Sequence, residues 1–377
     1  MLAIAHQGAP GQGEARLLPA LLPAHRPAPL FSAAMLLSIR HHLRYVYDRP
    51  VFLEPMTLRL TPKQDCSQQL LGHSLRLEAE PAGSSAIQAA DGSGALVCWF
   101  SQECDQLEIT MEARVRTLRS NPFDWIITFA PAQQLPARYP EAERSALAPY
   151  LDLYQGASLG APFQTQQQAP SQVQVQAPLG FGPGAGAGPG DGSVAAWAAE
   201  LAAAVDQNTT AFLMQLADRI HHDFQHVGRF EDEPMAPEQT LLGRTGACRD
   251  TAMLFVAACR SLGLAARFVS GYSIHHPPEV TEHELHAWAE VYLPGAGWRG
   301  YDPSLGLAVA DGHLVLATAP DHRLAAPVTG AYRGTGVTST MTYALSVRAL
   351  EAEAAETPEE LNPAHPEAGS PDPLDRL

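Results

Sequence analysis

Cys248 stands where a predicted helix begins, and that position suggests a nucleophile. Residues 245–263 read as one helix, in which Asp250 falls in the first turn and Gly263 supplies a natural stop. Unpaired N–H groups at a helix N-terminus favour a thiolate over a thiol and can bind a developing oxyanion. A free cysteine is more often a small buried hydrophobe, so the position alone does not establish catalysis. Cys259 lies in the middle of the helix, and we expect it only to pack.

A base and an orienting acid follow on the next predicted hairpin. His286 opens the strand 286–293, and Asp302 ends the return strand after the glycine-rich turn 294–297. With one bulge in that turn, Trp288 faces Asp302, and His286 lies diagonal to the carboxylate, roughly 7–8 Å away at the backbone. A carboxylate there can fix the tautomer of the imidazole and stabilise its charged form. The order of cysteine, histidine and carboxylate therefore predicts a triad in which His286 receives the thiol proton.

Four segments in this order resemble the core of bacterial transglutaminase-like proteins, which are often described as cysteine proteases. They are Gly246-Ala-Cys-Arg-Asp250, Arg260-Ser-Leu-Gly-Leu-Ala-Ala-Arg-Phe-Val-Ser-Gly-Tyr272, His286-Ala-Trp-Ala-Glu-Val-Tyr-Leu-Pro294 and Gly297-Trp-Arg-Gly-Tyr-Asp-Pro303. The resemblance implies an α+β fold with a papain-like cysteine-enzyme core. It also implies Cys248 as nucleophile, His286 as base and Asp302 as orienting acid.

The resemblance extends to the N-terminal part of the chain. Ile39-Arg-His-His-Leu-Arg-Tyr-Val-Tyr-Asp-Arg-Pro50 and Leu58-Arg-Leu-Thr-Pro62 are similar to the β domain that precedes this core in the family. Together the similar segments span about residues 36–345. The side-chain donor of the oxyanion hole is not fixed by the sequence, and Trp288 and Tyr272 are the candidates.

The predicted activity is acyl chemistry on an amide of a peptide or protein. A thioester on Cys248 can be resolved by water, as in a protease or amidase, or by an amine, as in cross-linking of glutamine to lysine. We favour hydrolysis because water is always available, whereas amine transfer needs an acceptor channel that excludes water. A non-catalytic module that binds peptides in the same cleft is a further alternative, although all three triad residue types are present.

A metal site is the remaining alternative. Histidines are frequent near the two helix cysteines, and the candidate ligands are His221, His222, His226, His275, His276, His283 and His286 with Cys248 and Cys259. Their spacing matches no usual zinc motif, because a structural site has pairs of cysteines two to four residues apart. We therefore expect neither a metal nor a cofactor.

The elements around these residues divide the chain into regions. Strict alternation of apolar and polar residues, as in 107–116, predicts a small antiparallel β-sandwich over 36–120. The catalytic domain is expected over 121–350, with helical spacing from 194 to about 223. Within it, the Gln-, Gly- and Pro-rich stretch 157–193 is predicted to be a flexible insertion.

The two ends of the chain lack such patterning. Residues 1–34 are predicted to be a disordered extension, or to precede a true start at Met35, because proline interrupts every apolar run. Residues 351–377 are acidic and rich in proline, and we expect a disordered tail.

Composition limits the possible partners. The chain of 377 residues has 24 Lys and Arg against 40 Asp and Glu, a net charge of −16. That balance argues against a nucleic-acid partner, which needs a basic face. No apolar run is long enough for a membrane span. Five cysteines, an odd number, argue against a disulfide framework and favour the cytoplasm. The expected partner is a peptide or protein substrate, and the oligomeric state is left open.

Overall fold

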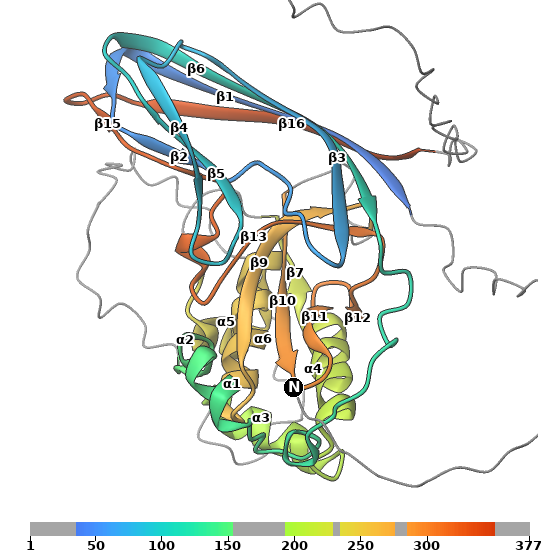
Figure 1. Cartoon of the computed structure of the whole chain (residues 1–377). Helices are drawn as coiled ribbons and strands as arrows, with labels where there is room; N and C mark the ends of the chain where they lie inside the picture. Colours follow the sequence, from blue (N-terminus) through green and yellow to red (C-terminus); the bar gives the residue numbers. More distant parts are fainter. Residues whose placement is uncertain (1–34, 154–192, 229–233, 276–284, 351–377) are drawn as a thin grey trace, which may run out of the picture. The chain divides into compact units, whose positions relative to one another are not determined.

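The computed structural model describes residues 35–153, 193–228, 234–275 and 285–350 (Figure 1). The predictions for residues 1–34 and 351–377 concern segments outside this part of the chain. The same holds for the predicted insertion 157–193, of which only Ser193 is described.

The predicted alternation forms the two longest strands in the described part of the chain. In β1 (Leu36–Leu53) the apolar residues at odd positions are buried except for the half-buried Tyr45, whereas Arg40 and Arg44 are exposed. Strand β6 (Glu103–Thr117) alternates in the same way and pairs with β1 in antiparallel register. Period-two patterning thus places one face of each strand in the core, as expected for a half-buried sheet.

Two antiparallel sheets make up the β-sandwich. The first contains β15 (Tyr332–Arg333), β1, β6 and β3 (Gln68–Glu78), with β16 (Ser339–Leu350) also paired to β1. The second has the order β14 (Val328–Thr329), β2 (Met56–Leu58), β5 (Gly94–Trp99) and β4 (Gly83–Gln88). Their apolar faces share one core cluster, so the predicted packing of two sheets is present.

Three of these strands come from the far end of the described chain. Strands β14, β15 and β16 lie within residues 328–350, which the sequence assigned to the catalytic domain. In Figure 1, β16 in red runs beside β1 in blue, so the first and last described strands are neighbours. Local patterning does not show which distant strand a given strand will pair with, and the predicted limit at residue 120 therefore leaves these three strands out.

A separate antiparallel sheet, outside the sandwich, lies against helix α6 (Cys248–Ser261). Its order is β12 (Leu307–Ala308), β11 (Gly297–Asp302), β10 (His286–Leu293), β9 (Ala266–Ser273) and β13 (His313–Ala319). Ala289, Val291 and Leu293 share one face of β10 and pack with the apolar residues of α6. The other face carries Trp288, which is also fully buried. This sheet is thus covered on both faces by packed side chains.

The predicted helical stretch 194–223 is two helices. They are α3 (Val194–Ala203) and α4 (Thr209–Asp223). Asp206 and Gln207 between them have positive φ, and the Asn208 side chain accepts a hydrogen bond of 2.9 Å from the Ala211 N–H. Left-handed residues followed by an N-cap end one helix and begin the next.

Shorter elements complete the described structure. These are α1 (Glu141–Ala146), α2 (Ala148–Leu151), α5 (Pro237–Gly243), two 3₁₀ turns (Ala130–Ala132, His322–Leu324), and the parallel pair of β7 (Gln225–His226) and β8 (Thr245–Gly246). Among the described residues, no helix combines the length and apolar character that crossing a membrane requires.

The sandwich is hydrogen-bonded directly to the edge strand β13. The Gln68 side chain donates from Nε2 to the Val315 carbonyl at 2.9 Å and accepts from the Val315 N–H at 2.8 Å. The Asp91 carboxylate accepts from both the N–H and the hydroxyl of Thr318. Because all these groups are largely buried, the bonds hold β13 in a defined position.

Candidate active site

The start of α6 is fixed by a buried carboxylate. Asp250 accepts hydrogen bonds of 2.8 Å from the N–H groups of Ala247, the N-cap residue, and of Met235. The first-turn acid predicted from the sequence therefore satisfies one of the unpaired donors of the helix. Cys248 is the first residue of the helix and is partly exposed, as its predicted position requires. Gly263 ends the helix region with a φ of +75°.

The hairpin has the register that the sequence suggested. Ala289 pairs with Tyr301, and Leu293 pairs with Gly297 across a turn of three residues. Gly297 has a φ of +71°, which glycine adopts without strain. Continuing this pairing brings Trp288 opposite Asp302 and leaves His286 diagonal to the carboxylate. The glycine at the end of the turn thus sets the positions of both predicted triad residues.

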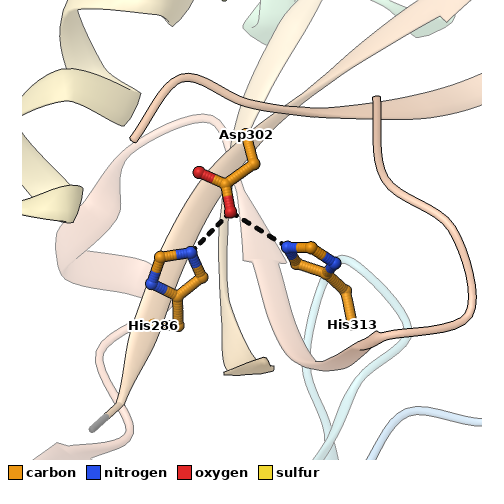
Figure 2. Close-up of side chains that lie close together, drawn as sticks. All are labelled: His286, Asp302 and His313. Carbon is orange, nitrogen blue, oxygen red and sulfur yellow. Dashed lines mark hydrogen bonds and ion pairs between the residues drawn. The ribbon is translucent and has the colours of Figure 1, made fainter. Parts of the chain in front are cut away.

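His286 and Asp302 meet in a short hydrogen bond. Nε2 of His286 donates to Oδ2 of Asp302 over 2.6 Å (Figure 2). Asp302 is completely buried, and the His286 side chain is 11% exposed. An ionised carboxylate can only accept hydrogen bonds, so Nε2 of His286 carries the proton. The second nitrogen of the ring, Nδ1, points away from Asp302 in Figure 2 and is left for another partner.

Cys248 lies within interaction range of His286, since its side chain contributes to the raised pKa of the imidazole. Burial alone would lower the pKa of His286. The charge and hydrogen bond of Asp302, together with the Cys248 side chain, instead raise that pKa well above its usual 6.5. The structure thus brings the three predicted residues together, since both Asp302 and Cys248 act on the imidazole of His286.

Asp302 is held from both oxygens. Oδ1 accepts from the Ser304 N–H at 3.0 Å, the Ser304 hydroxyl at 2.6 Å and the Leu305 N–H at 3.3 Å. Burial would raise the pKa of Asp302, but the charge and hydrogen bond of His286, and then those of His313, keep it well below its usual range. Each of these donors stabilises the ionised form. Asp302 is therefore a carboxylate throughout the neutral range.

His313 is a fourth member of the cluster that the sequence did not identify. This first residue of β13 is buried, and its Nε2 lies 2.9 Å from Oδ2 of Asp302, the oxygen that also binds His286 (Figure 2). Its ring also makes an edge contact with Trp288. The only sequence signal was a histidine directly before the apolar run 314–319.

The two imidazoles and the carboxylate also offer a set of metal ligands. Their ligand atoms all lie within 4.8 Å of one another, and two histidines with one carboxylate can bind zinc. However, ligands held at 2.0–2.2 Å from an ion are roughly 3 Å or more from each other. The separation of 2.6 Å between His286 and Asp302 is shorter and fits a hydrogen bond. We therefore interpret the cluster as a hydrogen-bonded network.

Two of the histidines considered as zinc ligands have other hydrogen-bond partners. Nδ1 of His221 hydrogen-bonds to the Ser304 carbonyl at 2.9 Å, and Nδ1 of His222 lies 3.0 Å from the Asp218 carbonyl. Cys259 is completely buried in α6, and burial raises the pKa of its thiol well above 9. Cys259 therefore packs, as expected, and does not contact the cluster of His286, Asp302 and His313.

The two candidate oxyanion donors are both buried. The Tyr272 hydroxyl shares a hydrogen bond of 3.0 Å with Nδ1 of His41, so it is already committed. Trp288 is fully buried beside His286 and His313, and its Nε1 has no hydrogen-bond partner among the described residues. The partly exposed start of α6 offers backbone N–H groups closer to the sulfur. Neither aromatic side chain is needed to supply that donor.

Comparison with known proteins agrees with this architecture. Residues 195–303 match the family model of the transglutaminase-like superfamily, and residues 37–116 match that of the bacterial transglutaminase-like N-terminal region. An uncharacterized protein of Mycobacterium tuberculosis is 27% identical over 304 residues, covering 78% of this chain and 86% of the relative. An uncharacterized protein of Mycobacterium leprae is 32% identical over 99 residues, covering 25% of this chain and 34% of the relative.

A solved structure has the same fold. The crystal structure of a candidate cysteine protease from Cytophaga hutchinsonii aligns with a TM-score of 0.58 at 18% identity, covering 86% of this chain and 93% of that protein. The predicted fold class, a transglutaminase-like α+β core with a β-rich N-terminal region, is confirmed.

Proposed function

Because this chain belongs to the transglutaminase-like superfamily, we propose that it performs thiol-dependent acyl chemistry on an amide of a peptide or protein. Cys248 is the nucleophile, His286 the acid and base, and Asp302 the residue that orients His286. The observation that carries this proposal is the hydrogen bond of 2.6 Å between His286 and Asp302, with the Cys248 side chain acting on the same imidazole.

The first half of the reaction forms a thioester. The Cys248 sulfur bonds to the amide carbon while His286 holds the proton of the thiol at Nδ1. The backbone N–H groups at the start of α6 stabilise the negative oxygen. The C–N bond then breaks, and His286 gives its proton to the leaving amine. The carboxylate of Asp302 keeps Nε2 protonated and stabilises the imidazolium throughout.

The second half is hydrolysis. Water attacks the thioester carbon and gives a proton to Nδ1 of His286. The C–S bond breaks, the proton returns to Cys248, and a carboxylic acid is released. A primary amine in place of water would instead form a new amide, which is the cross-linking outcome. We favour water because a reaction that prefers an amine has to exclude bulk solvent from the site.

The experiment compares the wild-type chain with Cys248→Ala and Cys259→Ala. Each protein is incubated with a library of glutamine-containing peptides, with and without a labelled primary amine, and the products are identified by mass spectrometry. We expect cleavage or deamidation by the wild type and by Cys259→Ala, and none by Cys248→Ala. A covalent adduct of increased mass is expected on the Cys248 peptide at short times.

Two results would contradict the proposal. Incorporation of the amine in preference to hydrolysis would show that the activity is cross-linking, carried out by the same triad. Equal alkylation rates of Cys248 and Cys259 at mildly acidic pH, with no product from any peptide, would favour a non-catalytic peptide-binding module. Cys259 is the matched control, since it lies on the same helix in a buried position.

We further propose that the protein works in the cytoplasm. All five cysteines are free thiols, and Cys66 among them is exposed. A nucleophilic thiol and an exposed free thiol both persist best in a reducing compartment. Fractionation of native cells with an antibody to the chain tests this location, and recovery in the envelope fraction would exclude it.

A further inference from the structure

Asp302 receives two imidazoles on a single oxygen. His286 approaches Oδ2 to 2.6 Å and His313 approaches it to 2.9 Å, from two different strands of the sheet. Figure 2 shows the two rings on opposite sides of this oxygen. The mechanism proposed above uses only the first imidazole, so the second requires its own explanation.

The surroundings of His313 favour a neutral ring. Its side chain is only 1% exposed, and burial lowers its pKa below 6.5, although Asp302 acts in the opposite direction. The charged and titratable groups that face it are Asp302 from β11, His286 from β10 and His275, two residues beyond the end of β9. Since the ionised carboxylate can only accept, a neutral His313 has to carry its proton on Nε2.

We infer that His313 is a positioning residue of the active site, which holds Oδ2 of Asp302 on His286 by donating a second hydrogen bond to that oxygen. The inference rests on the triad assigned above. Ser304 and Leu305 anchor Oδ1. A carboxylate fixed at one oxygen can still pivot, and His313 removes that freedom. Outer partners of this kind commonly fix the orientation of a functional side chain.

The sandwich holds His313 through the backbone of β13. Val315, two residues along the strand, makes two hydrogen bonds to Gln68 and accepts a third of 2.9 Å from the Lys63 N–H. His313 itself pairs with Ser273 of β9. The position of its ring is therefore set both by the sandwich and by the sheet that contains β9. This arrangement gives the N-terminal region a part in the geometry of the site.

The test uses the full chain and the variants His313→Gln, His313→Leu and His286→Gln. The amide nitrogen of glutamine lies about as far along the side chain as Nε2 of histidine, so it can donate to Asp302 in the same way. Leucine fills the space without a donor. Iodoacetamide is the probe, and the rate of Cys248 modification is followed by mass spectrometry from pH 4 to 10. His41→Gln is the control for loss of a buried histidine outside the site.

We expect His313→Leu to slow Cys248 alkylation at pH 7 by about 10-fold, an effect of the size that follows when a partner that orients a functional side chain is removed. His313→Gln should remain within about 3-fold of the wild type. The acid limb of the leucine variant should move to higher pH, because a less firmly held carboxylate stabilises the His286 imidazolium, and with it the Cys248 thiolate, less well. A purely structural role would not separate glutamine from leucine, and His41→Gln should keep the wild-type profile.

If His313→Leu does not fold, ¹⁵N-histidine NMR of the wild type decides the question. A His313 ring that carries a proton on Nε2 from pH 5 to 8 supports the inference, and a ring protonated on Nδ1 alone overturns it. Identical profiles for wild type, His313→Leu and His313→Gln also overturn it, provided His286→Gln changes the profile. If His286→Gln leaves the profile unchanged as well, the triad itself fails, and the positioning role fails with it.

Discussion

Nε2 of His286 lies 2.6 Å from Oδ2 of Asp302, on adjacent strands whose register is set by a glycine at the end of the turn. The contact is buried, so water does not weaken it. It couples the charges of the two residues. The pKa of His286 is raised and that of Asp302 is lowered, and the pair is charged at neutral pH.

Asp302→Asn should make the His286 imidazole neutral at pH 7. Without the carboxylate, burial is the main influence left, and burial lowers the pKa of an imidazole. The titration midpoint of His286 should therefore fall, so that the ring is neutral at pH 7. We expect turnover to drop on the order of 10⁴-fold, as when the carboxylate of a serine-protease triad becomes an amide. NMR titration of His286 measures the midpoint, and an unchanged value would refute the coupling.

Asp250→Ala should disturb the start of α6. It removes the acceptor for the N–H groups of Ala247 and Met235, both at 2.8 Å. Losing the acceptor at the N-cap and leaving a buried N–H donor without a partner each cost about 1–2 kcal/mol. We expect a loss of unfolding free energy of about 2–4 kcal/mol in urea, and slower alkylation of Cys248. Asp250→Asn keeps one acceptor and should lie between alanine and wild type. Wild-type stability of the alanine variant would contradict this account.

The sequence was sufficient for the residues whose neighbours are close along the chain. The helix start at Cys248 follows from local helix start and stop signals, with Asp250 in the first turn and Gly263 at the end. The pairing of His286 with Asp302 follows from strand alternation and one glycine turn. Local rules fix such features because each depends on a few residues of known conformational preference.

His313 escaped prediction for a physical reason. Every residue of β13 is buried, so this strand shows no alternation that would tell which face a side chain occupies. Its contact with Asp302 also depends on β9, which separates β13 from β10 in the sheet. The pairing of β16 with β1, about 300 residues apart, depends on long-range packing in the same way. Such contacts leave almost no trace in a single sequence.

Buried His41 should make the protein sensitive to acid. Burial and the neighbouring His42 lower the pKa of His41 to about 4, against 6.5 in the unfolded chain. The neutral form is favoured by folding, so this contribution is present above pH 6.5 and is lost as the pH falls toward 4. The loss amounts to about 3 kcal/mol between pH 7 and pH 4.

His41→Gln tests that sign directly. The amide does not titrate, so the variant should lose less stability than the wild type between pH 7 and pH 4. Urea unfolding at both pH values gives the comparison. His222→Gln is the control, because the His222 side chain is 65% exposed. An equal loss in wild type and His41→Gln would show that other groups cause the acid sensitivity.

Gln68→Leu should weaken the attachment of β13 to the sandwich. The Val315 N–H would lose its acceptor at 2.8 Å, while the Val315 carbonyl would keep the Lys63 N–H. A buried donor without a partner costs about 1–3 kcal/mol. Gln69→Leu is a matched control on the next residue, whose exposed side chain should change stability by less than about 0.5 kcal/mol. Equal effects of both substitutions, measured by urea unfolding, would contradict the attachment.

Gly271→Ala should be among the most damaging single substitutions in the sheet. A Cβ at this position would lie 2.0 Å from the Leu314 carbonyl oxygen and 2.6 Å from the Trp288 ring, and the backbone oxygen has no freedom to rotate away. Gly271 pairs with His286, and Leu314 follows His313. A shift of either strand would therefore also displace these two histidines from Asp302. We expect a loss of unfolding free energy of about 3 kcal/mol or more, typical of severe overpacking, together with loss of selective Cys248 alkylation.

Gly72→Ala is the matched control, because a Cβ at this strand glycine meets nothing within 4 Å, and it should leave stability nearly unchanged. Comparable stability of the two variants would mean that β9 and β13 are not packed as closely as described.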